Sequence, residues 1–235
     1  MHAASGIFNL RRLVLRAAVL MTEMGRNPVF NTIHMTNTAL APVCAFAGVN
    51  DDWEDNGMGN YYQERYSREY IQAVSIGRQF GSRCAVLGFI EDVSPEEAQE
   101  REECGLGVVL THELTWLRRP IWDKIHAQLC EWGYGEPTTK VWNYWYQDEF
   151  PAKITGVDSS SLVMRRADGE SIVIVSSWEN RAKLAKVKPR ADLVKRSFTA
   201  TDFRTGDKLS VVGGEIQVPL KAYRWRAIRI REVKK

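Results

Sequence analysis

The sequence predicts an α/β region followed by an all-β domain: a partial (β/α) TIM-type barrel and then a C-terminal antiparallel β-sandwich. Through residues 1–137, short apolar runs alternate with helical patterns of about 14 residues, which is typical of βαβ units and a parallel sheet. From 138 to 235 the pattern changes to short alternating strands separated by turns, which indicates a sandwich. A complete barrel needs about 250 residues, so residues 1–137 supply only the last portion of a (β/α)8-like barrel.

The chain opens with a pattern for a helix and two strands. Apolar side chains recur at helical spacing over residues 7–25, and Gly25 is a usual helix stop. We interpret this segment as a helix that covers a sheet rather than as a transit peptide, and the arginines within it exclude a secretory signal. Short buried strands are expected at Val29–His34 and Pro42–Gly48, followed by an Asp/Asn/Gly-rich loop over residues 49–60.

The rest of the α/β region continues the alternation. Ser67 and Ser94 are plausible helix N-caps, and Pro95 with the acids after it is a good first helical turn. Residues Leu106–Leu114 fit a strand or a helix equally. The expected elements are the helix Ser67–Phe80, the buried strand Arg83–Ile90, the helix start at residues 94–103 and the helix Arg119–Trp132, which ends at Gly133.

The all-β domain, 138–235, contains clear hairpin signals. Turn sequences separate Ser161–Arg165 from Ser171–Ser177 and Ser197–Asp202 from Lys208–Val212, and a Gly-Gly turn lies within Val211–Val218. The last strand changes the phase of its apolar alternation near Ile228, which predicts a β-bulge.

Composition excludes several functional classes. The net charge of +3 divides into −6 for residues 1–137 and +9 for the remainder, which suggests two differently built parts. The four cysteines show no CxxC pairing and no metal-like spacing with histidine, so we expect no metal and no cofactor. Cys44 and Cys84 lie inside predicted apolar strands, and we expect them to be buried free thiols. No apolar run approaches 18 residues, so no membrane partner is expected and the cytoplasm is the default location.

Polar and aromatic residues collect where predicted strands end, and this is where ligands bind in parallel α/β sheets. Carboxylates and amides hold sugar hydroxyls, and an aromatic face stacks on a pyranose, so the cluster suits a carbohydrate. The opposing interpretation is that these are solvated loop residues and helix caps. The candidate substrate-binding residues are His34, Asn37, Asp52, Trp53, Glu54, Tyr61 and Glu91, and the catalytic residues are unknown.

Other sites are less favoured. His112 and Glu113 lie in the ambiguous segment, and the chain has no HExxH, GxSxG or Gly-rich phosphate loop. Basic residues gather between Arg181 and Arg196, but without the interleaved aromatic platform of RNA-binding motifs. We therefore do not expect a nucleic-acid partner.

Several segments in order resemble bacterial proteins related to glycoside hydrolase family 123. They are HMTNT, GVNDDWEDN, the helix REYIQAVSIGRQFG, LGFIED and VWNYW before the sandwich. The resemblance covers most of this chain but only the last third to half of the family's length, which comprises a (β/α)8 barrel and a C-terminal β-sandwich. It implies β-N-acetylhexosaminidase chemistry, in which an Asp-Glu pair assists the substrate's own acetamido group.

The resemblance also implies that this chain lacks the catalytic pair, because in the family the pair lies on an earlier barrel strand. Glu91 and Asp92 stand in the reverse order. We therefore expect a glycoside-hydrolase-like protein or fragment, inactive alone, that recognises an N-acetylhexosaminide-type carbohydrate. The alternative is a non-catalytic carbohydrate-binding or structural module. Unpaired sheet edges further predict self-association or completion by a missing N-terminal barrel portion.

Overall fold

The structure is a computed structural model of residues 1–235. It describes residues 2–27, 32–34, 49–55, 61–74, 83–88, 93–116, 120–195 and 197–233. The chain divides into two compact units that interleave along the sequence. The first comprises Met1–Asn60, Tyr66–Val93 and Glu113–Arg119, and the second comprises Tyr61–Arg65, Ser94–His112 and Pro120–Lys235. These bounds do not follow the expected boundary after residue 137, and the division into 1–137 and 138–235 stays a prediction.

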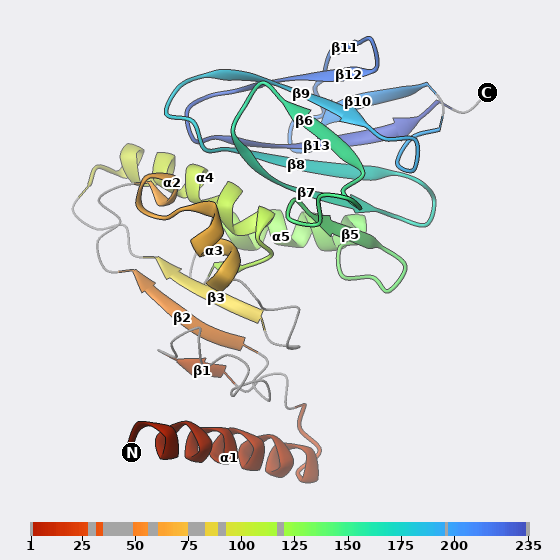
Figure 1. The fold of residues 1–235 in the computed structure, drawn as a ribbon. Helices are drawn as coiled ribbons and strands as arrows, with labels where there is room; N and C mark the ends of the chain where they lie inside the picture. The colour runs from red at the N-terminus through yellow and green to blue at the C-terminus, as the bar shows by residue number, and fades with distance from the viewer. Residues whose placement is uncertain are drawn as a thin grey trace. The chain divides into compact units, whose positions relative to one another are not determined.

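The first unit is built on a parallel sheet. Its strands lie in the order β1-β2-β3-β4, and the three pairings are parallel, as the alternating pattern predicts; Figure 1 labels β1, β2 and β3. That this sheet is part of a barrel stays a prediction. The elements are α1 (His2–Glu23), β1 (Thr32–His34), β2 (Val49–Asp55), α3 (Arg68–Val74), β3 (Arg83–Gly88) and β4 (Thr115–Trp116).

One expected loop of this unit is a strand. Residues Val49–Asp55 form β2, so the prediction of a loop over 49–60 is wrong for that stretch. The polar sequence gives a loop-like signal, but β2 pairs with β3 along its length, apart from the irregularity at Asp52, and with β1 over Val49–Asp51. The expected strand Pro42–Gly48 lies outside the described residues.

The helix signals of the first unit are confirmed where the structure describes them. The Tyr70 N–H donates to Ser67 Oγ at 3.1 Å, so Ser67 caps α3 as predicted. Gly25, after α1, has φ +69°, the left-handed conformation that ends helices. None of the described helices combines the length and the apolar character that a membrane span requires.

The second unit contains the sandwich together with helices. The helices are α2 (Tyr62–Arg65), α4 (Pro95–Thr111) and α5 (Pro120–Trp132). The strands are β5 (Lys140–Asn143), β6 (Ala152–Thr155), β7 (Ser159–Arg165), β8 (Ser171–Ser177), β9 (Lys183–Pro189), β10 (Phe198–Asp202), β11 (Val211–Val212), β12 (Glu215–Leu220) and β13 (Trp225–Glu232).

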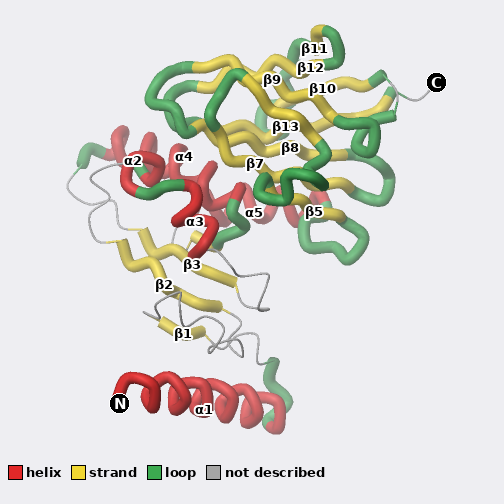
Figure 2. Tube along the Cα trace, in the orientation of Figure 1, coloured by secondary structure: helices red, strands yellow, loops and turns green. Residues whose placement is uncertain are grey.

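Two antiparallel sheets face each other, which confirms the predicted sandwich. One has the order β10-β13-β8-β7-β5 and the other β11-β12-β9-β6 (Figure 2). Their inner faces form one apolar core. The fully buried members of this core are Val163, Val173, Val175, Ala185, Val187, Leu193, Ile216, Val218 and Ile228.

Helix α4 packs on the outer face of the five-stranded sheet, against β7, β8 and β13. The central strands are therefore covered on both faces. In β8, Val173 and Val175 face the sandwich core, whereas the alternate residues Ile172 and Ile174 are also fully buried. Because both faces of β8 are covered, apolar residues occupy consecutive positions within Ser171–Ser177.

The same covering corrects the expected bulge in the last strand. Strand β13 pairs with β8 in an uninterrupted register from Trp225↔Ser176 to Ile230↔Ser171, so the predicted bulge is wrong. Ala227 and Ile228 are consecutive and both buried, because one faces α4 and the other faces the core. The alternation of apolar residues in β13 changes near Ile228 because both faces of the strand are buried there, and no extra residue is inserted.

Some of the remaining predictions for this unit are confirmed, and one is not. The ambiguous segment Leu106–Leu114 is helical to Thr111, within a helix whose Ser94 cap accepts from the Glu97 N–H. The β7–β8 hairpin and the Gly-Gly turn between β11 and β12 are confirmed. The expected hairpin of 197–202 with 208–212 is reduced to one bridge, Thr201↔Lys208, since β10 pairs with β13 instead.

Candidate functional site

The carboxyl ends of the parallel strands hold most of the candidate residues. His34 is the last residue of β1, and its backbone lies opposite Asp51 of β2. Strand β2 continues beyond this point for four residues, from Asp52 to Asp55. The polar run therefore lies at the end of the sheet where ligands bind in parallel α/β folds.

A β-bulge interrupts the pairing of β2 with β3 within this run. The register moves from Asp51↔Ala85 to Trp53↔Val86, which leaves Asp52 as the extra residue. Trp53 and Glu54 then pair with Val86 and Leu87. Bulges bend a strand and redirect its side chains, and they are over-represented beside active sites. The backbone thus brings His34, Asp52, Trp53 and Glu54 to one edge of the sheet.

The other candidates are Asn37, Glu91 and Tyr61. Asn37 and Glu91 lie outside the described residues. Tyr61 belongs to the second unit, where its ring centroid lies 4.9 Å from that of Tyr223. Burial, with a smaller contribution from the Glu100 carboxylate, raises the pKa of Tyr61 above its ordinary value.

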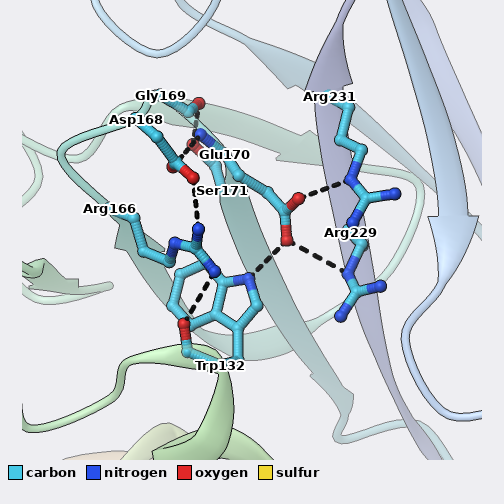
Figure 3. A network of polar contacts seen from close by, with 8 residues as sticks. All are labelled: Trp132, Arg166, Asp168, Gly169, Glu170, Ser171, Arg229 and Arg231. Atoms are coloured by element: carbon cyan, nitrogen blue, oxygen red, sulfur yellow. Dashed lines mark hydrogen bonds and ion pairs between the residues drawn. The ribbon is translucent and has the colours of Figure 1, made fainter.

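A second group of polar residues lies entirely within the second unit, around Glu170 (Figure 3). Its side chain is only 11% exposed. Trp132 Nε1 donates to Oε1, Arg229 Nε lies 3.2 Å from the same oxygen, and Arg231 Nε pairs with Oε2. Beside them, Arg166 Nη1 donates to the Trp132 carbonyl at 3.0 Å, and Nη2 pairs with Asp168. One carboxylate thus joins the end of α5, the β7–β8 turn and β13.

These residues border an open hollow of about 360 Å³. Glutamine, glutamate, arginine and aromatic side chains line it together. The Arg229 guanidinium lies over the Phe203 ring, with 4.9 Å from Cζ to the ring centroid, and Arg166 lies over Trp132 at 5.6 Å. The lining residues are Gln128, Glu131, Trp132, Arg166, Glu170, Phe203, Arg229 and Arg231.

The sequence interpretation missed this hollow. The one available signal is the pair of arginines two residues apart in β13, because alternate residues of a strand share a face. Nothing local connects them to Glu170, which comes from a turn about 60 residues earlier, or to Trp132 at the end of a helix.

His112 is fully buried and is part of a structural hydrogen-bond chain. Its Nδ1–H donates to the Val108 carbonyl at 2.8 Å, and its Nε2 lies 3.0 Å from the Tyr144 hydroxyl oxygen. Thr111 Oγ1 lies 2.8 Å from Ser160 Oγ, which links the same helix end to β7. These contacts hold the end of α4 on the sheet.

The described residues contain no group of three or more His, Cys, Asp or Glu that fits a metal ion. Of the two thiols that the structure describes, Cys104 is buried and Cys130 is exposed. Burial raises the pKa of Cys104 to about 12. Such a thiol stays protonated near neutral pH, so it is no nucleophile.

No protein-family model matches the chain, and no curated protein matches it. Solved structures do share its fold. One is a maltogenic α-amylase from Thermotoga neapolitana, 11% identical, with 95% of this chain and 59% of that chain covered and a TM-score of 0.52. Another is a family-27 glycoside hydrolase, a β-L-arabinopyranosidase from Geobacillus stearothermophilus, 12% identical, with coverage of 84% and 48% and a TM-score of 0.50.

The chain has a glycoside-hydrolase-like fold and spans less than two thirds of the length of either match. At 11–12% identity the likeness concerns the fold alone. The resemblance to glycoside hydrolase family 123 in particular stays a prediction.

Proposed function

We propose that this chain is the C-terminal part of a glycoside-hydrolase-like protein and that the carboxyl ends of its parallel strands bind a carbohydrate. The observation that carries the proposal is the backbone arrangement of β1 and β2, with His34 at a strand end and a bulge at Asp52. The order of the fold, a parallel sheet followed by a sandwich, supports it, as does the likeness to two glycoside hydrolases.

The proposed division of labour follows from the residues that are present. Trp53 supplies a stacking surface for a pyranose, and Asp52 and Glu54 accept hydrogen bonds from its hydroxyls. The general acid and its partner carboxylate belong to barrel strands that this chain does not supply. The chain alone therefore binds an N-acetylhexosaminide without cleaving it.

Two measurements on the purified chain test this proposal. Saturation-transfer NMR reports binding of p-nitrophenyl N-acetyl-β-glucosaminide, and released nitrophenolate reports hydrolysis. We expect binding without release, and loss of binding in Trp53→Ala. The matched control is Tyr146→Ala, which removes an exposed aromatic ring in the second unit. A chain that does not bind the glycoside, or a Trp53→Ala variant that binds it normally, contradicts the proposal.

Hydrolysis by the chain alone would contradict the absence of the catalytic pair. In that case Asp52→Asn and Glu54→Gln identify whether the strand-end carboxylates perform the chemistry, since each exchange removes the charge and keeps the shape. Binding that is retained in both variants while hydrolysis is lost would turn the proposal into one of a complete catalytic site.

A further inference from the structure

The hollow beside Glu170 has the features of a small-ligand site that is separate from the strand ends. Its volume of about 360 Å³ lies at the lower end of the range for small-molecule pockets. All of its lining residues belong to the second unit. It is polar and open, and it carries three arginines and two glutamates.

The two arginines of β13 are held in place and still have donors to offer. Their Nε atoms face the Glu170 carboxylate (Figure 3). Within the described part of the chain, their Nη groups make no hydrogen bond or ion pair. The end of a guanidinium with two Nη groups matches the two oxygens of a carboxylate. Because Glu170 and the Phe203 ring fix the Arg229 plane, little side-chain entropy remains to be lost on binding.

The part of the lining that comes from α5 suits hydroxyl groups. Gln128 and Glu131 are three residues apart on α5 and therefore share a face of the helix. An amide both donates and accepts, and a carboxylate accepts, which is the combination that holds the hydroxyls of a sugar. A guanidinium covers one face of the Trp132 ring and one face of the Phe203 ring, and the Trp132 side chain is buried, so the proposed recognition is assigned to the hydrogen-bonding groups.

The charge of the lining selects a singly charged ligand. Asp168 pairs with Arg166, whereas Arg229 and Arg231 share the single carboxylate of Glu170, so this group of three side chains carries one positive charge, which one ligand carboxylate balances. We propose that this hollow binds a carboxylate-bearing monosaccharide, a glycuronic acid, with the carboxylate on Arg229 and Arg231 and the hydroxyls on Gln128 and Glu131. This site does not depend on the strand-end function.

Isothermal titration calorimetry of the full chain with D-glucuronate, D-glucose and inorganic phosphate tests the proposal. We expect saturable binding of glucuronate, and binding of glucose and of phosphate at least about tenfold weaker, because charge-assisted bonds are the strong ones. Equal binding of glucose overturns the role of the arginines. Equal binding of phosphate shows a general anion site and overturns the sugar assignment, and no binding of glucuronate overturns the proposal.

Variants locate the site. Arg231→Gln removes the more exposed of the two guanidinium groups and is expected to weaken glucuronate binding about tenfold or more. The control is Arg181→Gln, which removes an arginine that is 72% exposed and lies outside the lining. Normal binding by Arg231→Gln overturns the proposal. If thermal melting shows that this variant is unfolded, Gln128→Ala tests the part of the lining that comes from α5, with weakening of several-fold expected and unchanged binding overturning the assignment.

The two proposals fail separately. Glucuronate binding to the hollow is expected to be unaffected by Trp53→Ala, and N-acetylhexosaminide binding is expected to be unaffected by Arg231→Gln. Loss of both ligands in either single variant would point to general unfolding, which thermal melting of the same sample detects.

Discussion

Gly107 of α4 lies directly against Trp225 of β13. A Cβ built on this glycine would come 2.7 Å from the Cβ of Trp225 and 2.5 Å from the Ser176 hydroxyl. Real Cβ atoms are not found so close to their neighbours. The absence of a side chain at residue 107 therefore sets how closely the helix approaches the five-stranded sheet.

Gly107→Ala is expected to destabilise the protein by about 1–3 kcal/mol, because the added methyl group must displace the helix or the strand. This outcome opposes intrinsic propensity, which favours alanine over glycine by about 1 kcal/mol in a helix. Urea denaturation followed by circular dichroism measures it. Gln99→Ala, at an exposed position of the same helix, is the control and should change stability by less than about 0.5 kcal/mol. A Gly107→Ala variant as stable as the control would refute the close approach.

Glu170→Gln is expected to lower the free energy of unfolding by about 2–3 kcal/mol. The variant keeps the shape of the side chain but leaves Arg229 and Arg231 without their shared anion. The figure is below that of a fully buried pair because the Arg231 side chain is 58% exposed. Chemical denaturation measures the loss. Asp192→Asn, which breaks the exposed pair with Arg190, is the matched control and should cost under about 1 kcal/mol.

The stability of the protein is expected to fall at alkaline pH because of Cys104. Burial raises the pKa of this thiol to about 12 from its ordinary 9.0. Between these values the unfolded chain loses the proton and the native chain keeps it, so the native state binds more protons and stability decreases as pH rises. The expected loss is about 1 kcal/mol between pH 8 and pH 10.

Urea midpoints measured at pH 8 and at pH 10 check this. Cys104→Ala should lose less stability over the interval than the parent chain, whereas Cys130→Ala, at an exposed position, should lose the same amount as the parent. An unchanged slope in Cys104→Ala would show that the thiol is not responsible. Tyr223, whose pKa burial also raises to about 12, contributes in the same direction in every variant.

Gln63→Leu is expected to cost about 1–3 kcal/mol. Its Nε2 donates to the Cys104 carbonyl at 3.2 Å and to the Tyr223 carbonyl at 3.1 Å, and it thereby fastens α2 to α4 and to the loop before β13. Leucine has a similar volume but leaves both buried carbonyls without that donor. Thermal unfolding measures the loss, with Gln147→Leu at an exposed turn as the control. Equal melting temperatures of the two variants would contradict the prediction.

The sequence predicts well those elements whose signal is local. The buried face of α5, formed by Trp122, Ile125, Leu129 and Trp132, follows directly from helical spacing. The cap at Ser94 and the β7–β8 hairpin are likewise encoded within a few residues. In each case neighbours along the chain carry the information.

Strand β2 and strand β13 show where this approach fails. The polar run at residues 49–55 becomes a strand only because two other strands pair with it. In β13, a helix from another part of the chain covers the second face, and the sequence alone suggested a bulge. The Glu170 hollow is missed for the same reason, since its walls come from α5, a hairpin turn and β13. The order of residues along the chain predicts the group at the strand ends, and the roles of its side chains stay a prediction.

The helical layer on the five-stranded sheet also determines how this protein can be divided in the laboratory. Expressing residues 138–235 alone would remove α4 and α5 and bare one apolar face of the sheet, including Leu162, Met164, Ile172 and Ile174. A face of that kind promotes aggregation. A soluble piece must retain the helices from residue 94 onward, so the practical unit for expression begins well before the first strand of the sandwich.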